Sequence, residues 1–205
     1  MKDSIFPTRA GLDRTRLGFT ESVLSSFRFL TEDYNFRAVK TEATFVRYES
    51  PHVFANVYHG RASFQLGFEI GRLNDGGGKE EQPYSLNMII EHMGAQQATG
   101  YTFLQASTQA RVEELVPKLA SLVKSYAAPF LTGEPHAFEQ LLETRLRISD
   151  RLHEEMRVRD VRQKADEAWQ SRDYVVLADL YGCILEHLTP AETKKLEYVK
   201  KRLPR

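Results

Sequence analysis

Part of the first half of the chain alternates between apolar and polar residues with a period of two, which is typical of β-strands. The alternation predicts four strands, at about residues 36–41, 44–50, 53–59 and 63–73. We interpret Pro51-His52 and Gly60-Arg61 as two-residue hairpin loops, with the glycine supplying a positive φ. Both hairpins then place one apolar set on a single face: Val46, Tyr48, Val53, Ala55, Val57, Phe64, Leu66, Phe68 and Ile70. Because a slip of one residue would exchange the two faces, we expect a four-stranded antiparallel meander.

The other face of the predicted sheet is polar and aromatic. Three rows cross it in this register: Arg47, Asn56 and Gln65; Phe45, Tyr58 and Ser63; and Glu49, Phe54 and Gly67, with Glu69 beyond. Tyrosine and arginine are favoured at protein-binding hot spots. The candidate partner-binding residues are therefore Arg47, Glu49, Phe54, Asn56, Tyr58, Gln65 and Glu69. Cover by C-terminal helices, with water over the rest, is the alternative for this face.

A helix is predicted before the strands, from an apolar stripe at helical spacing: Val23, Leu24, Phe27 and Leu30. Thr20 suits its N-cap, and Phe19 can pack on Leu24. After the strands, Ser85 suits the cap of a short helix, and Thr108 that of a longer one ending near Gly133. Residues 94–106 fit either a loop or a further edge strand.

These elements predict an α+β fold, in which a four-stranded antiparallel meander packs against helices and an all-helical part follows. The helical part divides into segments of about 135–170, 172–188 and 190–203. Thr189 and Pro190 begin the last segment with a capping-box pattern. The expected organisation is a flexible tail, an α+β domain and a helical C-terminal region, at residues 1–18, 19–133 and 134–205.

Composition narrows the choice of partner. Lys+Arg and Asp+Glu both number 28, whereas nucleic-acid binders normally show a basic excess, so we do not expect a nucleic-acid partner. Interleaved charges over residues 144–164 are typical of a solvated helix face. No apolar run approaches the roughly 20 residues of a membrane helix, and the first residues lack a signal-peptide pattern. A single cysteine, Cys183, fits a reducing compartment. We therefore expect a cytoplasmic protein that does not enter membranes.

Motifs for catalysis, metals or cofactors are weak. The glycine loop of residues 74–83 lacks the spacing of a phosphate-binding loop and runs into an acidic pair. The six histidines show no metal-ligand spacing. Asp179, Cys183 and His187 fall at i, i+4 and i+8 of a predicted helix, but neighbours stacked on one helix cannot converge on a thiol. Cys183 is better interpreted as a small core residue. We expect no catalytic residue, no metal and no cofactor.

The C-terminal region resembles a single tetratricopeptide repeat. The residues that carry the resemblance are Ala165, Ala168, Asp173, Tyr174, Leu177, Tyr181, Ile184 and Pro190. It implies two antiparallel helices that approach closely through small residues. Because a working array needs about three repeats, we expect a helical hairpin that does not bind peptides in the manner of such arrays.

A second resemblance covers roughly residues 20–130. It lies in the arrangement of TEDYNF, FVRYESPHVFANVYHG and FEIGRL, followed by YSL and a long helix. This part resembles small bacterial proteins of unassigned function, some of which are encoded beside toxins and regarded as immunity proteins. The resemblance implies a bacterial protein and identifies no catalytic residue.

We therefore expect a non-enzymatic protein that binds another protein, as an immunity or accessory factor. The alternative is a small hydrolase or other enzyme that uses Glu49 and Glu69 as acid and base beside Arg47 and Tyr58. A concave pocket around these four side chains would favour the enzyme, and a flat face would favour protein binding.

Phe54 gives a test of what covers the polar face. In the predicted register it lies opposite a glycine, which offers the ring no lateral wall. We expect residues of the 135–205 region to cover Phe54 at least partly, while Arg47, Asn56 and Gln65 stay more accessible.

Overall fold

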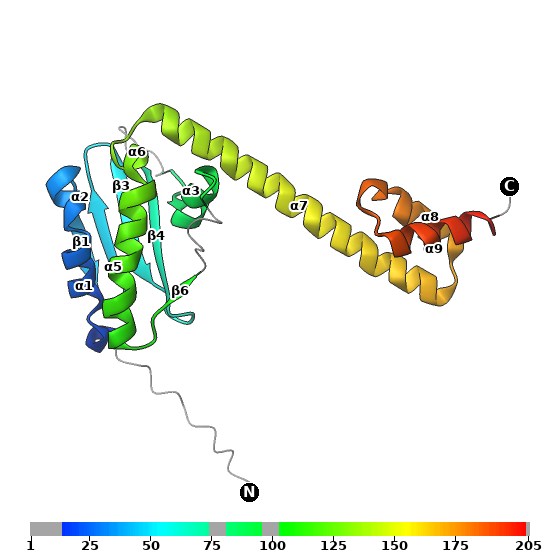
Figure 1. The fold of residues 1–205 in the computed structure, drawn as a ribbon, viewed down its shortest axis with the longest axis horizontal. Coiled ribbons are helices and arrows are strands. Elements are labelled where there is room, and N and C mark those ends of the chain that lie inside the picture. Colours follow the sequence, from blue (N-terminus) through cyan, green and yellow to red (C-terminus); the bar gives the residue numbers. More distant parts are fainter. Residues whose placement is uncertain (1–13, 74–80, 96–102, 204–205) are drawn as a thin grey trace, which may run out of the picture. The chain divides into compact units, whose positions relative to one another are not determined.

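The computed structural model describes residues 14–73, 81–95 and 103–203 (Figure 1). The chain divides into two compact units, unit 1 (Met1–Thr144) and unit 2 (Arg145–Arg205). Unit 1 combines an antiparallel sheet with helices and unit 2 is helical, so the predicted α+β class and helical C-terminal part are confirmed. The division falls later than the expected boundary after residue 133. The reason is that Ala137, Phe138 and Leu141 are buried in the core of unit 1.

The sheet of unit 1 has more strands than expected. Its strands within the described residues are β1 (Arg37–Glu42), β2 (Phe45–Glu49), β3 (Val53–His59), β4 (Gln65–Arg72), β5 (Tyr84–Ser85) and β6 (Leu104–Gln105). They follow the order β1-β2-β3-β4-β5, and β6 also pairs with β4. The predicted meander corresponds to β1–β4, and β6 lies in the stretch that fitted either loop or strand. Most of the predicted glycine loop, residues 74–80, lies outside the described residues.

The first predicted hairpin register is confirmed, and the second is wrong. Val46 pairs with Val57, as expected, but Val57 pairs with Phe68 and not with Phe64. The loop between β3 and β4 is longer than two residues, since the Gly60 N–H donates to the Gln65 carbonyl at 2.7 Å. The positive φ belongs to Phe64, at 54°, and not to Gly60. Because the shift is an even number of residues, the strand side chains keep their predicted faces.

The described helices of unit 1 up to residue 131 lie on one face of this sheet. They are the 3-10 helix η1 (Arg14–Leu17), α1 (Phe19–Ser26), α2 (Arg28–Asp33), α3 (Leu86–His92), α5 (Gln109–Tyr126) and α6 (Ala128–Leu131). Figure 1 shows α1 and α5 crossing the sheet side by side. Each of these helices contributes buried apolar residues to one core, together with the predicted apolar strand residues from Val46 to Ile70 except Phe64. We call this side of the sheet the inner face and the opposite side the outer face.

Helix starts were predicted with mixed success. The Ser85 side chain accepts from the Met88 N–H, and the Thr108 side chain caps α5, as expected. Thr20 is not a cap, because α1 begins directly after Gly18, whose φ is 65°. The Thr20 hydroxyl instead donates to the Glu42 carbonyl of β1 at 2.8 Å.

The apolar stripe before the strands also differs from the prediction. It forms two helices rather than one, with Phe27 buried at the break between α1 and α2. Leu24 is 39% exposed and does not pack inside. The flexible tail was expected to extend to residue 18, but Leu17 of η1, near the end of that range, is buried in the core.

Unit 2 packs the C-terminal part of the long helix α7 (Pro135–Ser171) against α8 (Tyr174–Gly182), the 3-10 helix η2 (Leu185–His187) and α9 (Pro190–Lys200). Its core consists of Val158, Ala165, Ala168, Leu177, Tyr181, Ile184, Leu196 and Val199. Arg172, with a φ of 59°, turns the chain between α7 and α8. The predicted capping box between Thr189 and Glu192 is confirmed at the start of α9. Within the described ranges, no helix is both long and apolar enough to cross a membrane.

Candidate functional site

One row of polar residues crosses the outer face of the sheet, and we call it the polar row. Strands β1 to β5 contribute one directly paired residue each: Lys40, Arg47, Asn56, Glu69 and Ser85. Directly paired residues of neighbouring strands share a face and have adjacent side chains. The row therefore carries two cations at the β1–β2 end and a carboxylate on β4. The predicted row instead ended in Gln65, which pairs with Gln105 at the start of β4.

Two aromatic rings of β3 flank the polar row. The Phe54 ring lies against Gly71 and the Tyr58 ring against Gly67, so closely that a Cβ at either glycine would collide with the ring. The predicted partners, Gly67 for Phe54 and Ser63 for Tyr58, are wrong because of the shifted register. A missing side chain at each glycine is what allows the ring to lie flat across β4.

Phe54 is 1% exposed, and two of its contacts lie within the sheet. The Arg47 guanidinium lies 4.3 Å from the centroid of the Phe54 ring, in the arrangement of a cation–π contact, and Gly71 lies beneath the ring. The buried residues of α7 in unit 1 join the core of the inner face instead. The expected cover of Phe54 by residues 135–205 stays a prediction.

The expected order of accessibility is confirmed, since Arg47, Asn56 and Gln65 are all more exposed than Phe54. Asn56 is 8% exposed, and the Arg47 side chain is 15% exposed because it is folded between Phe54 and Glu49. Arg47 Nε donates to Glu49 Oε1 at 2.7 Å. Gln65 is half-buried. Because Arg47 neutralises Glu49, this pair carries no net charge.

Glu69 differs from the other carboxylates of the outer face. Glu42 and Glu49 form ion pairs with Lys40 and Arg47, whereas Glu69 has no cationic partner among the described residues. Burial raises the pKa of Glu69, and a hydrogen bond from the Asn56 side chain opposes this rise. The pKa of Tyr58 is also raised, first by burial and then by the nearby Glu69 charge. Glu69 is thus a partly desolvated carboxylate without a counter-ion in the described part of the chain.

Asn56 supplies a second unsatisfied group at the same place. Its Oδ1 atom is buried and has no hydrogen-bond partner among the described residues. A buried acceptor without a donor costs about 1–3 kcal/mol. Asn56 and Glu69 pair directly across β3 and β4, so the orphan acceptor and the unpaired carboxylate are neighbours.

The arrangement does not bring the two carboxylates of the enzyme hypothesis together. Glu49 and Glu69 stand on β2 and β4, about 10 Å apart across the sheet, and in different rows. A cavity of about 450 Å³ reaches Glu49 and is lined by Asn35, Arg37, Glu49, Ser50 and Pro51. Neither Glu69 nor Tyr58 lines it, so this cavity does not unite the proposed acid and base.

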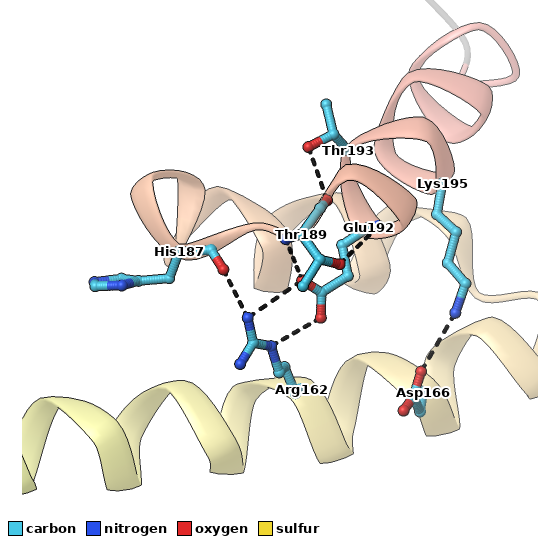
Figure 2. A network of polar contacts seen from close by, with 7 residues as sticks. All are labelled: Arg162, Asp166, His187, Thr189, Glu192, Thr193 and Lys195. Carbon is cyan, nitrogen blue, oxygen red and sulfur yellow. Dashed lines mark hydrogen bonds and ion pairs between the residues drawn. The ribbon is translucent and has the colours of Figure 1, made fainter.

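Unit 2 contains a polar network (Figure 2). The interleaved charges of residues 144–164 predicted a solvated helix face and did not predict this network. Arg162 of α7 donates from Nε to Glu192 Oε1 at 2.8 Å and from a terminal nitrogen to the His187 carbonyl at 2.6 Å. Glu192 also accepts from the Thr189 N–H at 2.6 Å. Burial would raise the pKa of Glu192, but these hydrogen bonds outweigh it and lower the pKa. Arg162 thus connects α7 to the start of α9.

A cavity of about 400 Å³ lies beside this network, lined by Glu154, Glu155, Val158, Arg159, Arg162 and His187. Three of its side chains are paired within unit 2, since His187 lies 3.0 Å from Glu154 Oε1 and Arg162 binds Glu192.

The candidate triad of Asp179, Cys183 and His187 does not form. Helix α8 ends at Gly182, and His187 lies in η2, where it contacts Glu154. Cys183 is exposed, so its interpretation as a core residue is wrong. No group of three potential ligands placed to hold a metal ion occurs in the part of the chain that the structure describes.

Comparison of the chain with known proteins found no matching family model, no matching curated protein and no matching solved structure.

Lys40 and Ser85 of the polar row were missed by the sequence analysis. Lys40 follows a bulge in β1 that breaks the alternation, and Ser85 lies in a strand of two residues.

Proposed function

We propose that the chain is a non-enzymatic protein that binds another protein through the outer face of unit 1. The observation that carries this proposal is the polar row, which runs across five strands between two aromatic rings held against glycines. Such a face is preorganised, because the rings and Arg47 are already ordered before a partner arrives. Preorganisation lowers the entropic cost of association. A row of this length suits a macromolecular surface better than a small substrate, which needs a concave site.

The resemblance of residues 20–130 to small bacterial proteins encoded beside toxins supports a narrower role. In that role the chain is a bacterial immunity or accessory factor that acts in the cytoplasm. Zero net charge and the mixed signs of the outer face support a protein partner over a nucleic acid.

Affinity capture with matched variants tests the proposal. The chain is immobilised and exposed to a lysate of the organism that encodes it. Tyr58→Ala removes a half-buried tyrosine from the outer face, and Tyr126→Ala removes a half-buried tyrosine of α5, which covers the inner face. Wild type and Tyr126→Ala should retain a stoichiometric partner, and Tyr58→Ala should lose it while keeping the wild-type circular dichroism. Equal capture by both folded variants, or no partner for wild type, would contradict the proposal.

A further inference from the structure

We propose that Glu69 and Asn56 form a binding site for a cationic side chain, lysine or arginine, presented by the partner protein. This inference rests on the proposed function, because it names the chemical group that the outer face recognises. It makes Glu69 the electrostatic anchor of the interface and Asn56 the group that orients the bound cation.

The strand register places Glu69 between two aromatic walls. Along the outer face of β4, Glu69 stands between Gly67 and Gly71. The Tyr58 ring lies across the first glycine and the Phe54 ring across the second. The carboxylate is therefore bordered on both sides by rings, and neither neighbouring position on its strand carries a side chain that could block it from above.

A hydrogen-bond donor that carries positive charge would satisfy both the carboxylate and the amide oxygen at this place. Glu69 lacks a counter-ion, and Asn56 Oδ1 lacks a donor, in the described part of the chain. An ammonium or guanidinium group supplies N–H donors to both atoms and neutralises the carboxylate at once. An anion would be repelled by Glu69, and a neutral amide would leave the carboxylate unpaired.

The surrounding rings favour the same kind of group. Cations lie favourably over aromatic faces, and the outer face already contains two such contacts, Arg47 over Phe54 at 4.3 Å and Lys40 over Phe45 at 5.4 Å. Tyr58 stands beside Glu69 and has no cation of its own among the described contacts. A partner side chain on Glu69 would complete the pattern seen on the neighbouring strands.

Short peptides provide a probe that needs no knowledge of the partner. Acetyl-Gly-Arg-Gly-amide and its lysine analogue are titrated into the ¹⁵N-labelled full chain up to about 20 mM, where a site with a Kd of about 5 mM is mostly filled. The citrulline peptide, which keeps the shape of arginine without its charge, is the control ligand. The charged peptides should shift the side-chain amide signals of Asn56, and the citrulline peptide should not. No shift, or equal shifts with citrulline, would overturn the inference.

Two isosteric variants distinguish a specific site at Glu69 from a general attraction between the charged peptides and the acidic side chains of the protein. Glu69→Gln removes the unpaired carboxylate, and Glu42→Gln removes a carboxylate of the same face that is already paired with Lys40. Glu69→Gln should weaken binding of the charged peptides at least about tenfold, and Glu42→Gln should leave it unchanged. Equal weakening in both variants would overturn the inference.

The partner captured by wild type distinguishes this inference from the proposed function. If capture depends on Tyr58 but survives Glu69→Gln, the outer face binds a protein and the cation site is refuted. If the peptides bind at Glu69 but capture is indifferent to Tyr58→Ala, the cation site stands and the proposed function fails.

Discussion

The two units are held together in different ways. Unit 1 buries a large apolar core between the inner face of the sheet and its helices, with large aromatic residues such as Phe27, Phe68 and Phe138 fully enclosed. Unit 2 has a core of eight buried residues, two of which are alanines. Since hydrophobic stabilisation grows with the apolar area removed from water, unit 2 gains much less from its core.

Polar contacts compensate in unit 2. Arg162 joins α7 to α9 through Glu192 and the His187 carbonyl, and Arg157 donates to the Cys183 carbonyl at 2.9 Å. Hydrogen bonds to charged groups are roughly twice as strong as those between neutral groups. The outer face of unit 1 resembles unit 2 in this respect, because it too carries ion pairs, between Lys40 and Glu42 and between Arg47 and Glu49. We therefore expect the free energy of unfolding to depend mainly on apolar packing in the core of unit 1, and more on charged contacts in unit 2 and on the outer face.

The largest expected effect is that of Phe68→Ala in unit 1. Phe68 is 1% exposed and stacks on Phe27 with ring centroids 6.2 Å apart. Removing a buried phenylalanine leaves a cavity and costs about 3–5 kcal/mol. Trp169, the single tryptophan, reports on unit 2, so urea melts followed by fluorescence and by circular dichroism separate the units. Both units contribute to the dichroism, so the part of its transition that belongs to unit 1 should move to lower urea, and the fluorescence transition should not move. Equal movement of both would show that the units unfold as one.

Phe54→Ala should cost about 3 kcal/mol, at the lower end for a buried phenylalanine. The ring is buried, but part of its cover is the Arg47 side chain, which can settle into the space left behind. Gln65→Ala is the matched truncation on the same face and should change the unfolding free energy by at most about 0.5 kcal/mol. Denaturant melts of both variants decide the point. A negligible loss for Phe54→Ala would mean that the ring contributes nothing to folding and is available to a partner.

The faces of the strands could be predicted from the sequence, but the pairing of the second hairpin could not. Alternation determines which side a residue occupies and is unchanged when a strand shifts by an even number of residues. Val57 meets an apolar residue whether it faces Phe64 or Phe68. A usable signal was present, because Phe54 and Tyr58 have the same spacing as Gly67 and Gly71. The observed register places both rings opposite glycines.

Other features depended on contacts far apart in the sequence. Thr20 has the right type for a cap, but its hydroxyl binds the Glu42 carbonyl, which helix-start rules cannot anticipate. Asn56 is buried and Arg47 is partly buried, although their polar residue types suggested more exposure. The true register brings Glu69 into the row of Arg47 and Asn56, whereas the predicted register placed it beyond the third row.

Arg162→Met tests the polar contribution to unit 2 and should cost about 1–3 kcal/mol. The substitution keeps the aliphatic stem but leaves Glu192, whose side chain is 15% exposed, without its cation. The fluorescence transition of Trp169 should move to lower urea. Lys164→Met is the control, because it breaks an ion pair with Asp160 on the exposed surface of α7, and such pairs contribute little. If both variants melt like wild type, the small apolar core of unit 2 is sufficient and the contrast between the units is weaker than we infer.

The smallest change in the free energy of unfolding is expected for Glu69→Gln. This substitution should stabilise the chain, whereas the others should destabilise it. Burial raises the pKa of Glu69 above its value in the unfolded chain, despite the opposing hydrogen bond from Asn56. A raised pKa means that the folded state binds the proton more tightly, so stability from this group is full at low pH and is lost as the pH rises through the folded pKa. Glutamine cannot ionise and avoids this loss.

At about pH 7, Glu69→Gln should therefore unfold at slightly higher urea than wild type, with a gain below about 1 kcal/mol. At about pH 3 the gain should disappear, because the glutamate is then mostly protonated in both states. Glu42→Gln should show no gain at about pH 7, since Lys40 already stabilises the ionised Glu42 at 2.9 Å. A loss of stability in Glu69→Gln at neutral pH would mean that the folded chain favours the ionised carboxylate. In that case a cation within the chain would already occupy the site that we assign to the partner.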